Sequence, residues 1–207
     1  MEKQRVSVLK VLLLFVLFSV GVMTFKPYTV RADSQTFKTN GKTFTVVTNY
    51  NNGTTLYQKI SGYYRQVART SKTARYRFSY GKKIYFSEGG EGRNCYTYTY
   101  IIGKKGFKFE KSICLTDHRG KYAIGYLSLA GDPSPSSMCC YNLSTKKVTK
   151  LGRGCDIHFI GNKIYYAYAC NQSSGWQTAM QVIRRNADGS GKKVIKTIRI
   201  KQGTSYM

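Results

Sequence analysis

One short pattern recurs along this chain: a glycine, then a lysine within two residues, then a short apolar run. Gly41, Gly81, Gly120 and Gly161 begin the four copies and are 40, 39 and 41 residues apart. The clearest copy reads Gly161-Asn162-Lys163-Ile164-Tyr165-Tyr166. A turn signal that returns at a fixed interval of this length is typical of repeat architectures, in which each repeat is one supersecondary unit. The spacing therefore predicts four repeats.

Each repeat contains four short strand candidates separated by turn residues. Tyr96-Thr97-Tyr98-Thr99-Tyr100 alternates β-prone residues with a period of two, as a strand does. A β-sandwich also uses many short strands, but it would not repeat its glycine and lysine in register. We therefore predict an all-β fold, a β-propeller of about four four-stranded blades that forms a short ring or an incomplete one. The expected strands span 36–39, 44–49, 55–60, 63–70, 74–79, 83–87, 95–102, 106–113, 114–117, 122–129, 138–143, 147–151, 156–160, 163–169, 177–184 and 193–200.

The last repeat also carries a family resemblance. Gly161 to Tyr166, followed by Arg185-Asn186-Ala187-Asp188-Gly189-Ser190, resembles the blade pattern of bacterial exported propellers related to the low-density-lipoprotein-receptor YWTD-type propeller. Tyr141 to Lys147 is a degenerate second copy, and the resemblance spans about residues 36 to 201. It implies a binding or scaffolding propeller without catalytic residues. Because such propellers have six blades, four repeats imply either a small closed ring or an open arc that needs a partner or a second copy.

The N-terminus has the three parts of a secretory signal. Lys3, Arg5 and Lys10 form a basic region, an apolar run covers 11–25, and Ala32 ends a small-residue cleavage site. This run is shorter than the ~20 residues that a membrane-spanning helix needs. We expect residues 1–32 to be a cleaved signal peptide, residues 33–207 to form the repeat domain, and the protein to be secreted, extracellular or attached to the cell wall.

The charge balance points to anionic partners. The chain has 34 Lys and Arg against 9 Asp and Glu, a net charge of +25. Such an excess predicts attraction to a polyanionic glycan or wall polymer, to anionic lipid, or unspecifically to nucleic acid, and a protein partner and self-association are further expectations. The alternative interpretation is a solvated basic surface without a ligand.

Antiparallel order places most of this charge on one face of a propeller. The turn between the first two strands of a blade and the turn between its last two strands lie on the same side. Arg65 is one cation near these turns. The lysines that we expect to bind a ligand there are Lys82, Lys83, Lys104, Lys105, Lys121, Lys146, Lys147, Lys163, Lys192 and Lys193.

Aromatic residues beside turns offer a second means of recognition. Tyr50, Tyr63, Tyr64 and Trp176 lie next to turn residues, where a ring could stack on a sugar or a base. Packing in the core or at the rim is the alternative role for each.

The six cysteines leave two questions open. Export would permit disulfides, and the even count allows either disulfides or buried thiols. Cys114 with His118 and Cys155 with His158 are valid zinc ligands. Strand alternation directs Cys155 and His158 to opposite faces, however, so we predict no metal and no cofactor.

Catalytic motifs are missing from the sequence. It contains no nucleophile elbow, no His-Glu-x-x-His, no phosphate loop and no paired-carboxylate site, and it has only two histidines. We therefore expect a protein that is not an enzyme. The alternative is a carbohydrate-active enzyme similar to a polysaccharide lyase, with Lys or Tyr as the base against an acidic sugar.

Overall fold

A computed structural model describes residues 32–89, 95–127, 137–173 and 176–199 of the chain. All of them belong to one compact unit, Ala32–Met207. In these ranges the only regular secondary structure is β-strand. No helix long and apolar enough to cross a membrane occurs in the described part of the chain.

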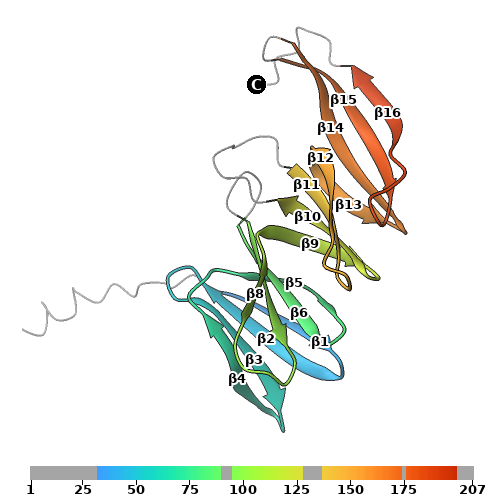
Figure 1. Cartoon of the computed structure of the whole chain (residues 1–207). Helices are drawn as coiled ribbons and strands as arrows, with labels where there is room; N and C mark the ends of the chain where they lie inside the picture. Colours follow the sequence, from blue (N-terminus) through green and yellow to red (C-terminus); the bar gives the residue numbers. More distant parts are fainter. Residues whose placement is uncertain (1–31, 90–94, 128–136, 174–175, 200–207) are drawn as a thin grey trace, which may run out of the picture. The chain divides into compact units, whose positions relative to one another are not determined.

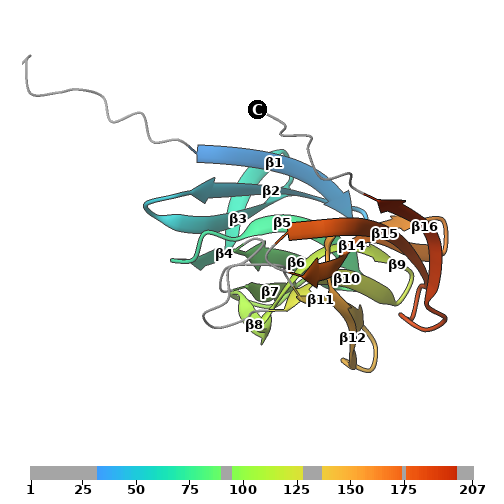
Figure 2. The same ribbon diagram turned by 90° about the horizontal axis from the view of Figure 1, so that it is seen from above.

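The strands form four separate antiparallel sheets, each made of four strands that pair in chain order (Figure 1; Figure 2). This confirms the predicted all-β fold of four four-stranded sheets in repeats of about 40 residues. The strands are β1 Ala32–Thr39, β2 Lys42–Asn49, β3 Gly53–Ile60 and β4 Tyr63–Thr70 in the first sheet; β5 Arg75–Tyr80, β6 Lys83–Glu88, β7 Tyr96–Ile101 and β8 Lys108–Lys111 in the second; β9 Ile113–Arg119, β10 Tyr122–Leu127, β11 Ser137–Asn142 and β12 Val148–Arg153 in the third; and β13 Cys155–Ile160, β14 Lys163–Ser173, β15 Trp176–Asn186 and β16 Lys193–Arg199 in the fourth.

Strand boundaries differ from the prediction at several places, including β1, which begins four residues earlier than expected, and the end of the second sheet. The strand expected over 106–113 is reduced to β8, and Ile113 belongs to β9 instead. Gly103 and Gly106 both have positive φ, at 85° and 73°, so the chain makes a wide connection before β8 begins. In the fourth sheet the two central strands are longer than predicted.

The first repeat is shifted by one residue relative to the others. Its tight turn is Asn40-Gly41, with φ of 49° and 69°, whereas the second turn is Gly81 followed by Lys82. Phe44 and Ile84 are each three residues after their glycines, yet both lie in the core between the first and second sheets. Side chains in a strand alternate between its two faces. The one-residue shift of the first turn therefore directs Phe44 toward the following sheet, whereas Ile84 points toward the preceding sheet.

Three apolar cores join consecutive sheets. Aromatic rings contribute much of the first, where Phe37 and Tyr76 stack with centroids 3.8 Å apart. Among the described residues, no core cluster combines the first sheet with the fourth. Representative fully buried members are Phe44, Leu56 and Ile84 between the first and second sheets, Tyr85, Leu115 and Ala123 between the second and third, and Ile124, Met138 and Ile164 between the third and fourth.

Buried hydroxyl groups tie the first three sheets together beside these cores. The Thr97 hydroxyl in β7 donates to the carbonyl of Ile113 at 2.7 Å and accepts from the N–H of Leu115 at 3.3 Å. Ser87 in β6 donates to the carbonyl of Leu115 at 2.7 Å. In the first sheet Thr54 makes the corresponding bonds to Ala74, donating to its carbonyl and accepting from its N–H. We call these contacts the hydroxyl clamps.

A β-bulge recurs in the fourth strand of every sheet. The extra, unpaired residues are Val67, Glu110, Leu151 and Ile195. A bulge re-aims the side chain that it displaces. Three of these side chains are apolar, and only the second sheet places a carboxylate at this position.

Candidate functional site

A basic groove lies where β4 of the first sheet meets the connection between β7 and β8 of the second. Its volume is about 390 Å³. We use the name basic groove for this hollow, whose cationic lining residues are Arg65, Arg69, Lys104 and Lys105. All four side chains are exposed, and no carboxylate is among the lining residues that the structure describes. The groove is therefore a concentrated positive site.

The floor of the basic groove is formed by buried, mostly apolar side chains. Ala68 is buried, and the buried ring of Tyr100 lies beside it. Burial raises the pKa of the Tyr100 hydroxyl, and a hydrogen bond donated by the backbone N–H of Gly103 offsets this rise only in part. The connection that carries Lys104 and Lys105 therefore contacts Tyr100 through Gly103.

Neutral polar groups and aromatic rings also lie in or beside the basic groove. Gln58 pairs with Arg65 across β3 and β4, and both line the groove. Tyr63, two residues before Arg65, projects from the same face of β4 by strand alternation and is 82% exposed. Its neighbour Tyr64 is 52% exposed. A planar, exposed ring therefore stands beside the cations.

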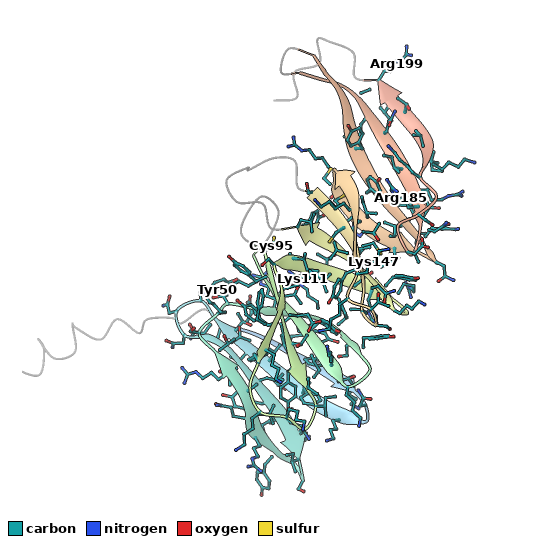
Figure 3. The ribbon with its side chains drawn as sticks, viewed as in Figure 1. Tyr50, Cys95, Lys111, Lys147, Arg185 and Arg199 are labelled. Atoms are coloured by element: carbon teal, nitrogen blue, oxygen red, sulfur yellow. The ribbon has the colours of Figure 1, made fainter. Side chains whose placement is uncertain are left out.

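The structure divides the ten predicted lysines into groups. Lys104 and Lys105 line the basic groove, and Lys82 lies next to them, because its carbonyl accepts from the N–H of Ile102 at 2.9 Å. Lys121, Lys147, Lys192 and Lys193 are exposed but belong to the third and fourth sheets, away from the groove lining (Figure 3 labels Lys147).

Three predicted ligand-binding lysines instead have internal partners. Lys83 and Lys146 lie 3.5 and 3.2 Å from the carboxylate of Glu110, and Lys163 donates to the amide oxygen of Asn186 at 2.6 Å. Sequence reasoning could not separate them from the others, because the bulge at Glu110 decides which lysines meet a carboxylate. It also missed Arg69, which comes from the interior of a strand rather than from a turn.

The other aromatic candidates are less suited to a ligand. The Tyr50 ring is half exposed, but its hydroxyl contacts Asp33 at 3.4 Å and accepts a short hydrogen bond from Arg75. The side chain of Trp176 lies outside the described residues. Tyr63 is therefore the predicted stacking residue that projects on the groove side of β4, whereas strand alternation directs Tyr64 to the opposite face.

The Cys and His candidates do not converge. The His118 ring stacks on Phe78 with centroids 4.5 Å apart, whereas His158 is exposed. Burial is the main cause that lowers the pKa of His118, which favours its neutral form. Within the described ranges, no group of three or more His, Cys, Asp or Glu side chains is arranged to hold a metal ion.

Comparison with known proteins gives only distant structural likeness. No protein-family model and no curated protein matches the chain. A crystal structure of TolB from Acinetobacter baumannii is similar over 76% of this chain and 41% of its own, with 18% identity and a TM-score of 0.47. A puromycin-hydrolyzing peptidase of Mycobacterium tuberculosis is similar over 82% of this chain and 33% of its own, with 9% identity and a TM-score of 0.45. The chain thus spans less than half the length of either structure.

Proposed function

We propose that this protein is an exported, non-enzymatic β-propeller module, similar to the YWTD-type propellers, that binds an anionic cell-surface polymer in the basic groove. The observation that carries the proposal is the grouping of Arg65, Arg69, Lys104 and Lys105 around one hollow without a lining carboxylate. Elsewhere Glu110 satisfies Lys83 and Lys146 internally, but the groove cations have no such acidic neighbour in the lining. An anionic ligand would supply the negative charge that the groove lining does not provide to these four cations.

The groove chemistry favours an acidic polysaccharide. The guanidinium groups of Arg65 and Arg69 can each bind a carboxylate, sulfate or phosphate through two parallel hydrogen bonds. Gln58 and Gln66 also line the groove and can bond to sugar hydroxyls. The exposed ring of Tyr63 can stack on a sugar ring while the groove cations bind the anionic groups of the polymer. Anionic groups and sugar rings occur together in acidic glycans.

The tyrosine in the groove lining is not suited to be the phenolic base of the lyase alternative. A phenolic base needs a lowered pKa, but burial raises the pKa of Tyr100, the tyrosine in the groove lining. Burial also raises the pKa of Tyr98, to about 12, and the pKa of Tyr141. These shifts argue against Tyr98, Tyr100 and Tyr141 as catalytic bases.

The test is the affinity of the full chain for polygalacturonate, measured by titration calorimetry at rising salt. We expect the combined change Arg65→Gln, Arg69→Gln, Lys104→Gln and Lys105→Gln to raise the Kd by roughly tenfold or more, because four charge-assisted contacts are lost. The matched control removes four charges elsewhere, with Lys147→Gln, Lys150→Gln, Lys193→Gln and Lys196→Gln. Equal weakening by both variants would show a general charge effect and overturn the proposal.

A second comparison identifies the ligand class. Tyr63→Ala should weaken binding to polygalacturonate but leave binding to linear polyphosphate unchanged, because polyphosphate has no sugar ring to stack on. If both affinities fall equally, or neither falls, the ring does not recognise the sugar.

A further inference from the structure

Two buried cysteines lie at the junction of the second and third sheets. Cys95 directly precedes β7 of the second sheet, and Cys114 is the second residue of β9 in the third. Each is 1% exposed, and both belong to the same apolar core cluster. Figure 3 labels Cys95 at the end of the second sheet from which β7 begins.

The hydroxyl clamp holds the backbone on both sides of Cys114 against the second sheet. Thr97, two residues after Cys95, bonds to the carbonyl of Ile113 at 2.7 Å and to the N–H of Leu115 at 3.3 Å, and these residues flank Cys114. Cys95 itself hydrogen-bonds to the Cys114 sulfur. The two thiols are therefore neighbours in a part of the fold where hydrogen bonds join the second and third sheets.

In the folded protein, the surroundings of Cys114 favour its thiolate more than those of Cys139 or Cys140 favour theirs. The hydrogen bond from Cys95 is the main cause that lowers its pKa to about 7, and the positive charge of Arg77 acts in the same direction against burial. Burial instead raises the pKa of Cys139 and of Cys140 to about 12.

We propose that Cys95 and Cys114 form a disulfide bond that covalently joins the second and third sheets. The oxidant is a low-molecular-weight or protein disulfide, R–S–S–R. The Cys114 thiolate attacks one of its sulfurs and releases R–S⁻, which leaves a mixed disulfide on Cys114. The Cys95 thiol then loses its proton and attacks the Cys114 sulfur, which releases the second R–S⁻. Two protein thiols are oxidised and one external disulfide is reduced.

The bond would form while the chain folds. Both sulfurs are enclosed in the finished core, so an external disulfide would reach them before the second and third sheets have closed on each other. Cys140 is a poor competitor, because its thiol donates to the carbonyl of Ala187 at 3.1 Å in the direction of the fourth sheet. Cys139 is near enough to Cys114 for their charges to interact, but it packs in a different apolar cluster from Cys95 and Cys114.

The test maps disulfides in the full chain after refolding with oxidised and reduced glutathione. Digestion without reductant and mass spectrometry should show the peptide that contains Cys95 linked to the peptide that contains Cys114. Dithiothreitol should lower the Tm of the oxidised chain by roughly 5–10 °C, because the bond closes a loop of about 20 residues. Alkylation of both cysteines after oxidising refolding, or linkage of Cys114 to Cys139, would overturn the proposal.

Two variants separate this pair from the other thiols. Cys114→Ser should abolish the linked peptide and make the Tm insensitive to dithiothreitol. The matched control Cys140→Ala, also a buried cysteine of the third sheet, should keep the link. If Cys114→Ser does not fold, the peptide map of the unmodified chain still shows whether Cys95 and Cys114 are linked.

Discussion

At the scale of single residues, Glu110 is the side chain that departs most from the repeat. It occupies the bulge at which the other sheets carry Val67, Leu151 and Ile195. Its side chain is 5% exposed, and it accepts from the Tyr141 hydroxyl at 3.0 Å and pairs with two lysines. One carboxylate thereby joins the second sheet to the third.

The ionisation of Glu110 should make stability depend on pH. Burial would raise its pKa, but the hydrogen bonds from Lys146 and Tyr141 and the charge of Lys83 outweigh burial, so the pKa in the folded protein is lowered. A carboxyl whose folded pKa is below its unfolded pKa contributes stability that is fully present above the unfolded pKa. That contribution is lost as the pH falls through the folded pKa.

We therefore predict that Glu110→Gln lowers the free energy of unfolding by about 1–2 kcal/mol at pH 7, a modest value because Lys146 is largely exposed. The loss should disappear in acid below the folded pKa of Glu110. Urea unfolding over a series of pH values from 7 downward measures both effects, and Asp156→Asn, at an exposed carboxylate, is the control. A loss that does not shrink as the pH falls would contradict the assignment.

At the scale of elements, the hydroxyl clamps explain how one sheet positions the next. Thr54 and Thr97 both meet the backbone near the start of the following sheet, at Ala74 and Leu115. Both hydroxyl groups are in fully buried residues. Backbone groups buried between sheets would otherwise lack partners, which costs stability.

Thr97→Val keeps the shape of the side chain but removes the hydroxyl. We expect it to lower the free energy of unfolding by roughly 1–3 kcal/mol, because it leaves the carbonyl of Ile113 and the N–H of Leu115 buried with one partner fewer. Thr55→Val, at a half-buried position of β3, should change stability by less than about 0.5 kcal/mol. Similar losses in the two variants, measured by urea unfolding, would argue against the clamp.

At the scale of the whole molecule, charge repulsion is the dominant electrostatic feature. The net charge is +25, and the described residues form three ion pairs between side chains. The edge strand β16 is exposed along its length and combines Val194, Ile195 and Ile198 with three cations. The positive charge on this edge opposes pairing of two copies through it.

Salt should therefore stabilise this protein. We expect the Tm to rise by several degrees between 0.02 and 0.5 M NaCl, because screening weakens the repulsion among many cations more than it weakens a few ion pairs. Thermal unfolding followed by circular dichroism measures the change. The variant with Arg65→Gln, Arg69→Gln, Lys104→Gln and Lys105→Gln has four fewer positive charges, so its Tm should rise less with salt. A Tm that falls with salt would contradict the prediction.

The sequence by itself determined the number of sheets, their four-strand order and the places of most turns. These features depend on contacts between residues close in the chain, namely glycines with positive φ such as Gly81 and the two-residue alternation of Tyr96 to Tyr100. Even the shifted first repeat has a local origin, in the turn Asn40-Gly41.

Only the tertiary structure decided what each charged or reactive side chain meets. Lys83 and Lys104 look equivalent in the sequence, yet one faces Glu110 and the other lines the basic groove. Cys95 and Cys114 become neighbours because two sheets pack together there. The physical reason is that bulges and the packing between sheets set these distances, and neither is encoded in a short stretch of chain.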